Sequence, residues 1–127
     1  MSNMTLWAKV FGVIAGVSGF LAVALGAFGA HALRERLSPE DLAVFETGVR
    51  YQMYHALALL AVAWLVDRGV GGGMVAGWAF TLGTVVFSGS LYVLVLTGQR
   101  WMGAVTPLGG VAFLVGWVAL ATAFFRA

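Results

Sequence analysis

The charged residues of this chain lie in a few short groups, and the long uncharged stretches between them constrain the fold most. These stretches cover residues 10–33, 51–66, 69–99 and 101–125. A helix that crosses the hydrocarbon core of a bilayer, roughly 30 Å thick, needs about 20 mostly apolar residues. Three of the four stretches exceed that length. Because backbone polar groups in lipid must be hydrogen-bonded internally, we expect the stretches to be helical.

The composition agrees with a membrane protein. Charged residues make up 9% and hydrophobic residues 61% of the 127 residues, whereas a soluble domain has about 25% charged residues. We predict an all-α fold, a four-helix transmembrane bundle in one domain, with spans near 8–31, 48–66, 74–97 and 106–125. The absence of strand alternation excludes a small outer-membrane barrel. The net charge of +2 is too small to suggest nucleic acid as a partner, so the expected surrounding is the lipid bilayer.

The second span has an unusual beginning. As a helix, residues 51–66 reach only about 24 Å, so the span must begin near Thr47 or earlier. The sequence Ser38-Pro39-Glu40-Asp41 is typical of a helix start, with a capping hydroxyl, proline in the first turn and two acids at the positive end of the helix dipole. We therefore predict a short amphipathic interfacial helix at about 39–47, which runs into the second span or bends into it at Gly48.

Polar side chains inside or beside the predicted spans are the candidate functional residues, because they are costly in a membrane. They are His31, Glu46, Arg50, Tyr51, Gln52, Tyr54, His55, Ser88, Ser90, Tyr92 and Thr106. Glu46 and Arg50 stand four residues apart with the acid first, which predicts an ion pair. The second span is polar on more than one side at its start, so we expect it to pack under the first connection, close to His31.

Three interpretations of this polar cluster are open. It forms a structural network, or it lines a ligand or ion pathway in which His31 and His55 titrate near neutral pH, or the two histidines hold a metal or haem. The chain has no cysteine. It also shows no nucleophile–base pair, phosphate loop or carboxylate dyad. The sequence therefore predicts no enzyme activity, catalytic residue, metal ligand or cofactor.

Small residues four positions apart predict close contact between helix backbones. The glycines concerned are Gly12, Gly16, Gly26, Gly73, Gly77, Gly109, Gly110 and Gly116. We expect most of them to serve packing within the chain, with an oligomer interface as the alternative.

Four sequence motifs, in order along the chain, are similar to those of a known family. They span Gly26–His31, Phe45–His55, Phe87–Tyr92 and Thr106–Gly110. They resemble the YgdD-like small membrane proteins, catalogued as domain of unknown function 423 and related to the eukaryotic transmembrane protein 256. The resemblance covers nearly the whole chain. It implies a four-helix bacterial inner-membrane protein and no assigned activity.

We therefore expect an uncharacterised multi-pass membrane protein that is not an enzyme and acts as a structural or assembly partner. Its partners would be a second copy of the chain or other membrane proteins. One alternative is a small oligomeric transporter or channel that uses His31, Glu46, Arg50 and His55. Another is a haem- or metal-binding membrane protein.

The positive residues are almost equally divided between the two sides of the membrane. With four spans, three positive residues share the side of the termini and four share the other side: Lys9, Arg68 and Arg126 against Arg34, Arg36, Arg50 and Arg100. The rule that positive loops face the cytoplasm therefore gives little guidance. The clustering of three arginines around the first connection favours both termini outside.

Overall fold

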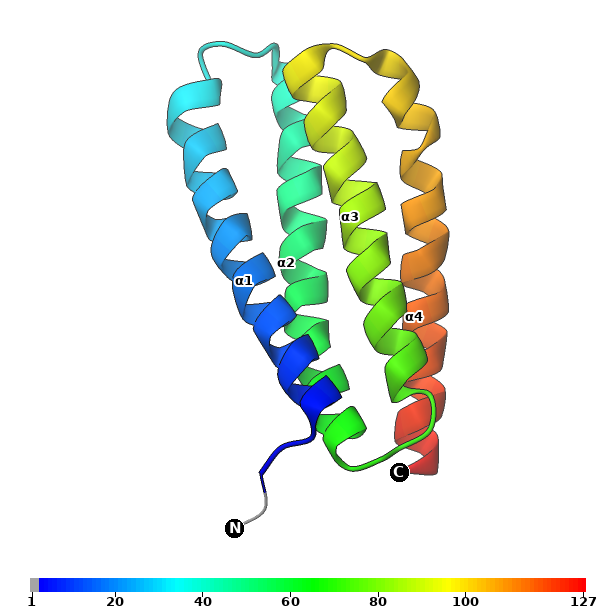
Figure 1. Ribbon diagram of the computed structural model, residues 1–127. Coiled ribbons are helices and arrows are strands. Elements are labelled where there is room, and N and C mark those ends of the chain that lie inside the picture. The colour runs from blue at the N-terminus through cyan, green and yellow to red at the C-terminus, as the bar shows by residue number, and fades with distance from the viewer. Residues whose placement is uncertain (1–2) are drawn as a thin grey trace.

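The computed structural model describes residues 3–127 and consists of helices joined by short connections (Figure 1). Its elements are α1 (Leu6–Phe28), the π-helical turn η1 (Gly29–Leu33), α2 (Pro39–Asp67), α3 (Gly73–Thr97), the 3₁₀ helix η2 (Arg100–Ala104) and α4 (Thr106–Arg126). Within these described residues, four helices are long and apolar enough to cross a membrane. The predicted all-α, four-helix transmembrane fold is confirmed.

The helix starts follow from local sequence. The hydroxyl of Ser38 accepts a hydrogen bond from the backbone N–H of Asp41 at 3.1 Å, and Pro39 stands in the first turn of α2. Thr5 caps α1 in the same manner, by accepting from the N–H of Ala8 at 3.4 Å. Each cap satisfies a backbone donor that the helix itself leaves unpaired.

The separate interfacial helix is not confirmed, because residues 39–47 form the first turns of one continuous helix, α2. Its 29 residues extend about 43 Å, longer than a hydrocarbon core of roughly 30 Å. The start of α2 therefore projects towards the headgroups as part of the span. Gly48 does not end the helix there. A Cβ at this position would lie 2.8 Å from the ring of Tyr92, so the glycine provides room for that ring.

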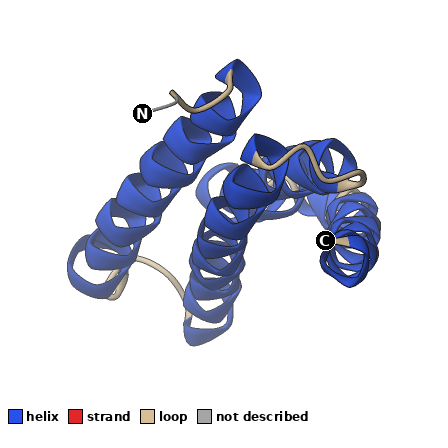
Figure 2. Ribbon diagram, turned by 90° about the horizontal axis from the view of Figure 1, so that it is seen from below, coloured by secondary structure: helices blue, strands red, loops and turns tan. Residues whose placement is uncertain are grey.

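The four long helices pack in chain order. α1 packs on α2, α2 on α3 and α3 on α4, whereas α2 and α4 meet much less and α1 has no extensive backbone contact with α3 or α4. Viewed along the helices, α1 and α4 lie on opposite sides of the molecule (Figure 2). Helix α2 is thus flanked by α1 and α3, and α3 by α2 and α4. The start of α1 and the end of α4 lie at the same end of the molecule (Figure 1).

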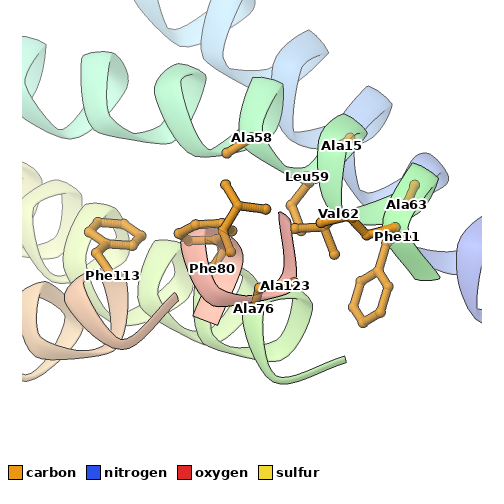
Figure 3. Packing of buried hydrophobic residues seen from close by; sticks show 12 residues of the cluster. Phe11, Ala15, Ala58, Leu59, Val62, Ala63, Ala76, Phe80, Phe113 and Ala123 are labelled. Carbon is orange, nitrogen blue, oxygen red and sulfur yellow. The ribbon is translucent and has the colours of Figure 1, made fainter. Parts of the chain in front are cut away.

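The main hydrophobic core combines aromatic rings with small residues (Figure 3). Phe11, Phe80 and Phe113 are almost fully buried among alanines of the neighbouring helices. Rings on one helix lie against glycines on the next: Phe80 against Gly116, and Phe113 against Gly83. A Cβ at either glycine would lie 2.5–2.6 Å from ring carbons, closer than carbon atoms can approach without a shift. Close packing of this kind substitutes for the hydrophobic drive that lipid removes.

The predicted packing glycines divide into two groups. In the first group, a Cβ would lie within 4 Å of an atom of another helix. These glycines are Gly26, Gly73, Gly77, Gly109, Gly110 and Gly116. At Gly12 and Gly16, by contrast, a Cβ would meet nothing within 4 Å. The Gly12–Gly16 pair on α1 therefore has no packing role within the described chain.

Candidate functional site

The polar residues predicted to form one cluster are divided between several places. Gln52, His55, Ser88 and Ser90 are buried, and Tyr92 and Thr106 are half-buried. The exposed members are His31, Glu46, Arg50, Tyr51 and Tyr54. The charged residues and His31 at the edge of the predicted membrane thus face outward together with Tyr51 and Tyr54, while the other members lie between helices.

Gln52 links three helices. Its Nε2 donates to the backbone carbonyl of Ser18 on α1 at 2.9 Å, and the hydroxyl of Tyr92 on α3 donates to its Oε1 at 2.7 Å. Gln52 itself belongs to α2 and is 5% exposed. A side-chain amide that both donates and accepts between helices fixes their mutual register, because no water is present in lipid to replace either bond.

Ser88 makes a second link between α2 and α3. Its hydroxyl donates to the backbone carbonyl of Gly48 at 2.6 Å, and the residue is 1% exposed. This carbonyl can be reached because glycine has no side chain to hold the helices apart. The same glycine admits the ring of Tyr92, so the two polar links between α2 and α3 lie next to each other.

His55 is enclosed between α2, α3 and α4. Its Nδ1 lies 2.6 Å from the carbonyl oxygen of Tyr51, and Trp117 Nε1 donates to its Nε2 at 3.1 Å. Since a carbonyl oxygen only accepts, Nδ1 must carry the proton and Nε2 must be the acceptor. The imidazole is therefore neutral, with both nitrogens engaged. It stacks on Phe113, with ring centroids 3.5 Å apart and planes 4° apart.

A further polar contact joins α3 to α4 near their connection. The hydroxyls of Ser90 and Thr106 lie 2.5 Å apart. Each also contacts a backbone carbonyl of its own segment, Phe87 for Ser90 and Met102 for Thr106. This pair closes the end of the α3–α4 hairpin.

The predicted ion pair between Glu46 and Arg50 is not formed. Within residues 3–127 the salt bridge that the structure forms joins Arg100 and Asp41, through two hydrogen bonds of 2.9 and 3.0 Å. It ties the α3–α4 connection to the first turn of α2. Arg100 presents its guanidinium fork to both carboxylate oxygens, which is the stronger geometry for such a pair. At 64% and 20% side-chain exposure, it is nevertheless a surface interaction.

His31 lies apart from His55. It belongs to the π-helical turn η1 at the end of α1 and is exposed, whereas His55 lies inside the molecule against Trp117 and Phe113. In the part of the chain that the structure describes, no group of three or more His, Cys, Asp or Glu side chains is placed to hold a metal ion. Because both nitrogens of His55 are engaged by Tyr51 and Trp117 while His31 is exposed on η1, the two histidines are not arranged as a shared ligand pair.

Sequence reasoning missed Trp117 and Thr84. Trp117 lies within α4, away from the membrane boundary where tryptophans usually gather. An indole N–H at that depth needs a partner, which was the available signal. Thr84 has a buried hydroxyl with no hydrogen-bond partner among residues 3–127. Nothing in its sequence context distinguishes it from Thr81, which donates to the carbonyl of Gly77.

Two lateral grooves flank the central helices. One, of about 450 Å³, lies between α1 and α3 over α2 and contains Ser18, Gln52 and Thr84 in its lining. The other, of about 500 Å³, lies between α2 and α4 and is lined by aromatic residues around His55 and Trp117. Both follow from the packing of the helices in a row, because each central helix is only partly covered by its two neighbours.

Comparison with known proteins gives a consistent result. The family described as "Protein of unknown function (DUF423)" matches residues 25–110. The chain is 49% identical over 117 residues to the UPF0382 membrane protein YwdK of Bacillus subtilis, covering 91% of this chain and 95% of the relative. It is 43% identical over 115 residues to the UPF0382 inner membrane protein YgdD of Escherichia coli K12, covering 90% and 88%. No solved structure matches the chain.

Proposed function

We propose that this chain, which belongs to the DUF423 family of UPF0382 membrane proteins, acts by associating with other proteins in the membrane rather than by catalysis. The family resemblance seen in the sequence is confirmed, and the protein is a multi-pass membrane protein. The relative YgdD is named an inner membrane protein, and we assign this chain to the same membrane. The partner is a second copy of the chain or another membrane protein.

The observation that carries the proposal is the internal use of the intramembrane polar groups. Gln52 and Ser88 bond helix to helix, and His55 uses both its nitrogens within the bundle. Side chains bonded in this way orient the helices and have little capacity left for acid–base chemistry. This arrangement supports a scaffold whose active part is its outer surface.

Helix α1 offers the surface for association. In the apolar stretch of the first span, Leu6–Leu33, 17% of the residues are buried inside the molecule, against 44% in that of α2. Gly12 and Gly16 lie on this helix with no neighbour within 4 Å of a Cβ. Small residues four apart allow another helix to approach closely in lipid, so this side of α1 is suited to a transmembrane helix of a partner.

Cysteine crosslinking tests the proposal cleanly, because the chain contains no cysteine. A Gly16→Cys variant in native membranes should form a disulfide-linked dimer, or a defined crosslink to one other protein, on mild oxidation. Leu114→Cys is the matched control, since Leu114 is 67% exposed on α4, at the opposite side of the molecule. Crosslinking at position 16 but not at 114 supports association through α1. Failure of both, with a monomer that co-purifies with no stoichiometric protein, contradicts it.

The transport alternative has less support. Along α2, Arg50 and Glu46 precede His55 by five and nine residues, which are axial distances of about 7.5 and 13.5 Å. Glu46, Arg50 and His31 are exposed while His55 is enclosed. Proton or solute flux in liposomes that disappears in His55→Ala would nonetheless replace association with transport. A Soret band in the purified protein would favour haem binding in the same way.

A further inference from the structure

The groove between α1 and α3 has the size and position of a binding site for a lipid-soluble small molecule. It measures about 450 Å³, within the range of small-molecule sites, roughly 300–1,000 Å³. On α3 its lining extends from Thr81 to Tyr92, a length of about 16 Å along the helix. It therefore covers about half the thickness of the hydrocarbon core, and a ligand would enter sideways from the lipid.

The lining has an apolar end and a polar end. Ile14 and Leu59 contribute to the apolar end, whereas Gln52, Ser88 and Tyr92 lie towards the end of the groove near the α1–α2 connection. None of the lining side chains carries a formal charge. A charged headgroup drawn into this part of the membrane would find no partner of opposite sign. The groove is therefore suited to a long apolar chain that bears a neutral polar group.

The hydroxyl of Thr84 points independently to such a ligand. It lies in the wall of the groove, and its oxygen is buried without a hydrogen-bond partner. Thr81 and Thr97 on the same helix donate to the carbonyl four residues earlier, but Thr84 does not. A buried unpaired hydroxyl costs free energy. Since threonine in a helix adopts two χ1 rotamers, this hydroxyl can turn into the groove and bond a ligand there.

We propose that the groove binds one neutral long-chain lipid that carries a hydroxyl or carbonyl group. The polar group of the ligand lies beside Thr84, close to Gln52 and Tyr92, and its hydrocarbon chain lies along Ile14 and Leu59. This site goes beyond the proposed association and does not depend on it. The association surface on α1 is the side of Gly12 and Gly16, neither of which lines the groove.

Photolabelling with matched glycine variants tests the site. The probe is 1-hexadecanol carrying a diazirine on its chain, added to the full-length protein in phosphatidylcholine nanodiscs. A Cβ at either Gly89 or Gly16 would meet nothing within 4 Å, but Gly89 lines the groove and Gly16 does not. Leucine at position 89 therefore fills the groove without disturbing helix contacts. We expect saturable labelling within residues 13–21 or 81–92, reduced about tenfold or more by Gly89→Leu and unchanged by Gly16→Leu.

A second comparison tests recognition of the polar group. Thr84→Val keeps the shape of the side chain and removes the hydroxyl. It should weaken labelling by the alcohol about two- to tenfold and leave labelling by a diazirine-bearing hexadecane unchanged. Both glycine variants should melt at or near the wild-type temperature, which separates loss of binding from loss of fold.

Three results would overturn the proposal. The first is equal labelling by alcohol and alkane with no effect of Thr84→Val, which would show that any acyl chain occupies the groove without recognition of a polar group. The second is labelling that does not saturate or that Gly89→Leu leaves unchanged. The third is a dimer that Gly89→Leu dissociates, which makes a second copy the occupant. Crosslinking through Gly16→Cys is read separately, so the association proposal and the lipid site succeed or fail independently.

Discussion

Replacing Gln52 by leucine removes the residue that links α1, α2 and α3. The substitution eliminates two interhelical hydrogen bonds, to the Ser18 carbonyl and from the Tyr92 hydroxyl. Each such bond in a membrane protein contributes about 0.6 kcal/mol on average. The Ser18 carbonyl keeps its partner within α1, but the Tyr92 hydroxyl loses its acceptor on α2, at about 1–3 kcal/mol. We therefore expect Gln52→Leu to lower the free energy of unfolding by about 2–4 kcal/mol.

The double variant distinguishes this account from a simple packing effect. Tyr92→Phe alone leaves the Oε1 of Gln52 unpaired, so it should also destabilise by about 1.5–3.5 kcal/mol. In Gln52→Leu/Tyr92→Phe both partners are apolar and no orphan remains. The double variant should then lose only about 1 kcal/mol, less than either single variant.

The free energies can be measured by unfolding in mixed micelles with increasing sodium dodecyl sulfate, followed by far-ultraviolet circular dichroism. Gln99→Leu, at an exposed position in the α3–α4 connection, is the control and should change stability by less than about 0.5 kcal/mol. Destabilisation of the double variant equal to the sum of the two single variants would refute the reasoning, because it would mean that Gln52 and Tyr92 act separately.

Three more predictions concern the packing, the surface and the topology. Gly77→Leu places a side chain where the ring of Phe11 lies, so it should cost about 1–3 kcal/mol in the same unfolding assay; wild-type stability would show that Phe11 does not hold α1 there. Arg50→Ala should change the unfolding free energy by no more than about 0.5 kcal/mol, because Arg50 is exposed and makes no salt bridge with Glu46; a larger loss of stability would indicate that Arg50 and Glu46 do form an ion pair. A C-terminal green fluorescent protein fusion should be dark in cells and a C-terminal alkaline phosphatase fusion active, since the arginines favour both termini outside; bright cytoplasmic fluorescence would reverse the orientation.

The spans and the helix starts could be predicted from sequence because they depend on local features. The uncharged stretches set the number of crossings, and the Ser38–Pro39 pair sets the start of α2. The same local pattern predicts a separate interfacial helix, which the structure does not form. A helix that begins at Pro39 and meets no breaker continues through Gly48, so amphipathic composition alone did not end it.

The contacts of the polar residues could be predicted only in part. The sequence identified Gln52, Ser88 and Tyr92 as candidates, because polar groups are rare in spans. It did not pair them, since the partners stand 34–40 residues apart and their pairing depends on how the helices rotate. The expected pair of Glu46 and Arg50 relied on helical spacing, but at an exposed position the ordering of two long side chains offsets the gain.

Glycine had a role that spacing did not reveal. Gly48 and Gly83 belong to no predicted small-residue row, yet each admits an aromatic ring from the next helix. Gly12 and Gly16 form a regular row, yet a Cβ at either would meet no atom within 4 Å among residues 3–127. The pairing of a glycine with a ring depends on the facing helix, which a local pattern does not contain.

Thiol accessibility in intact membrane vesicles tests most directly whether the intramembrane polar residues hold the helices together or line an aqueous path. Ser88→Cys places a thiol at the buried α2–α3 contact, whereas Gly71→Cys and Gly103→Cys place one in connections at opposite ends of the helices. The account predicts that a membrane-impermeant maleimide modifies position 71 from one side only and position 103 from the other only, and that position 88 stays unmodified until the protein is denatured. Rapid modification of the thiol at position 88 from either side of the native membrane would contradict it.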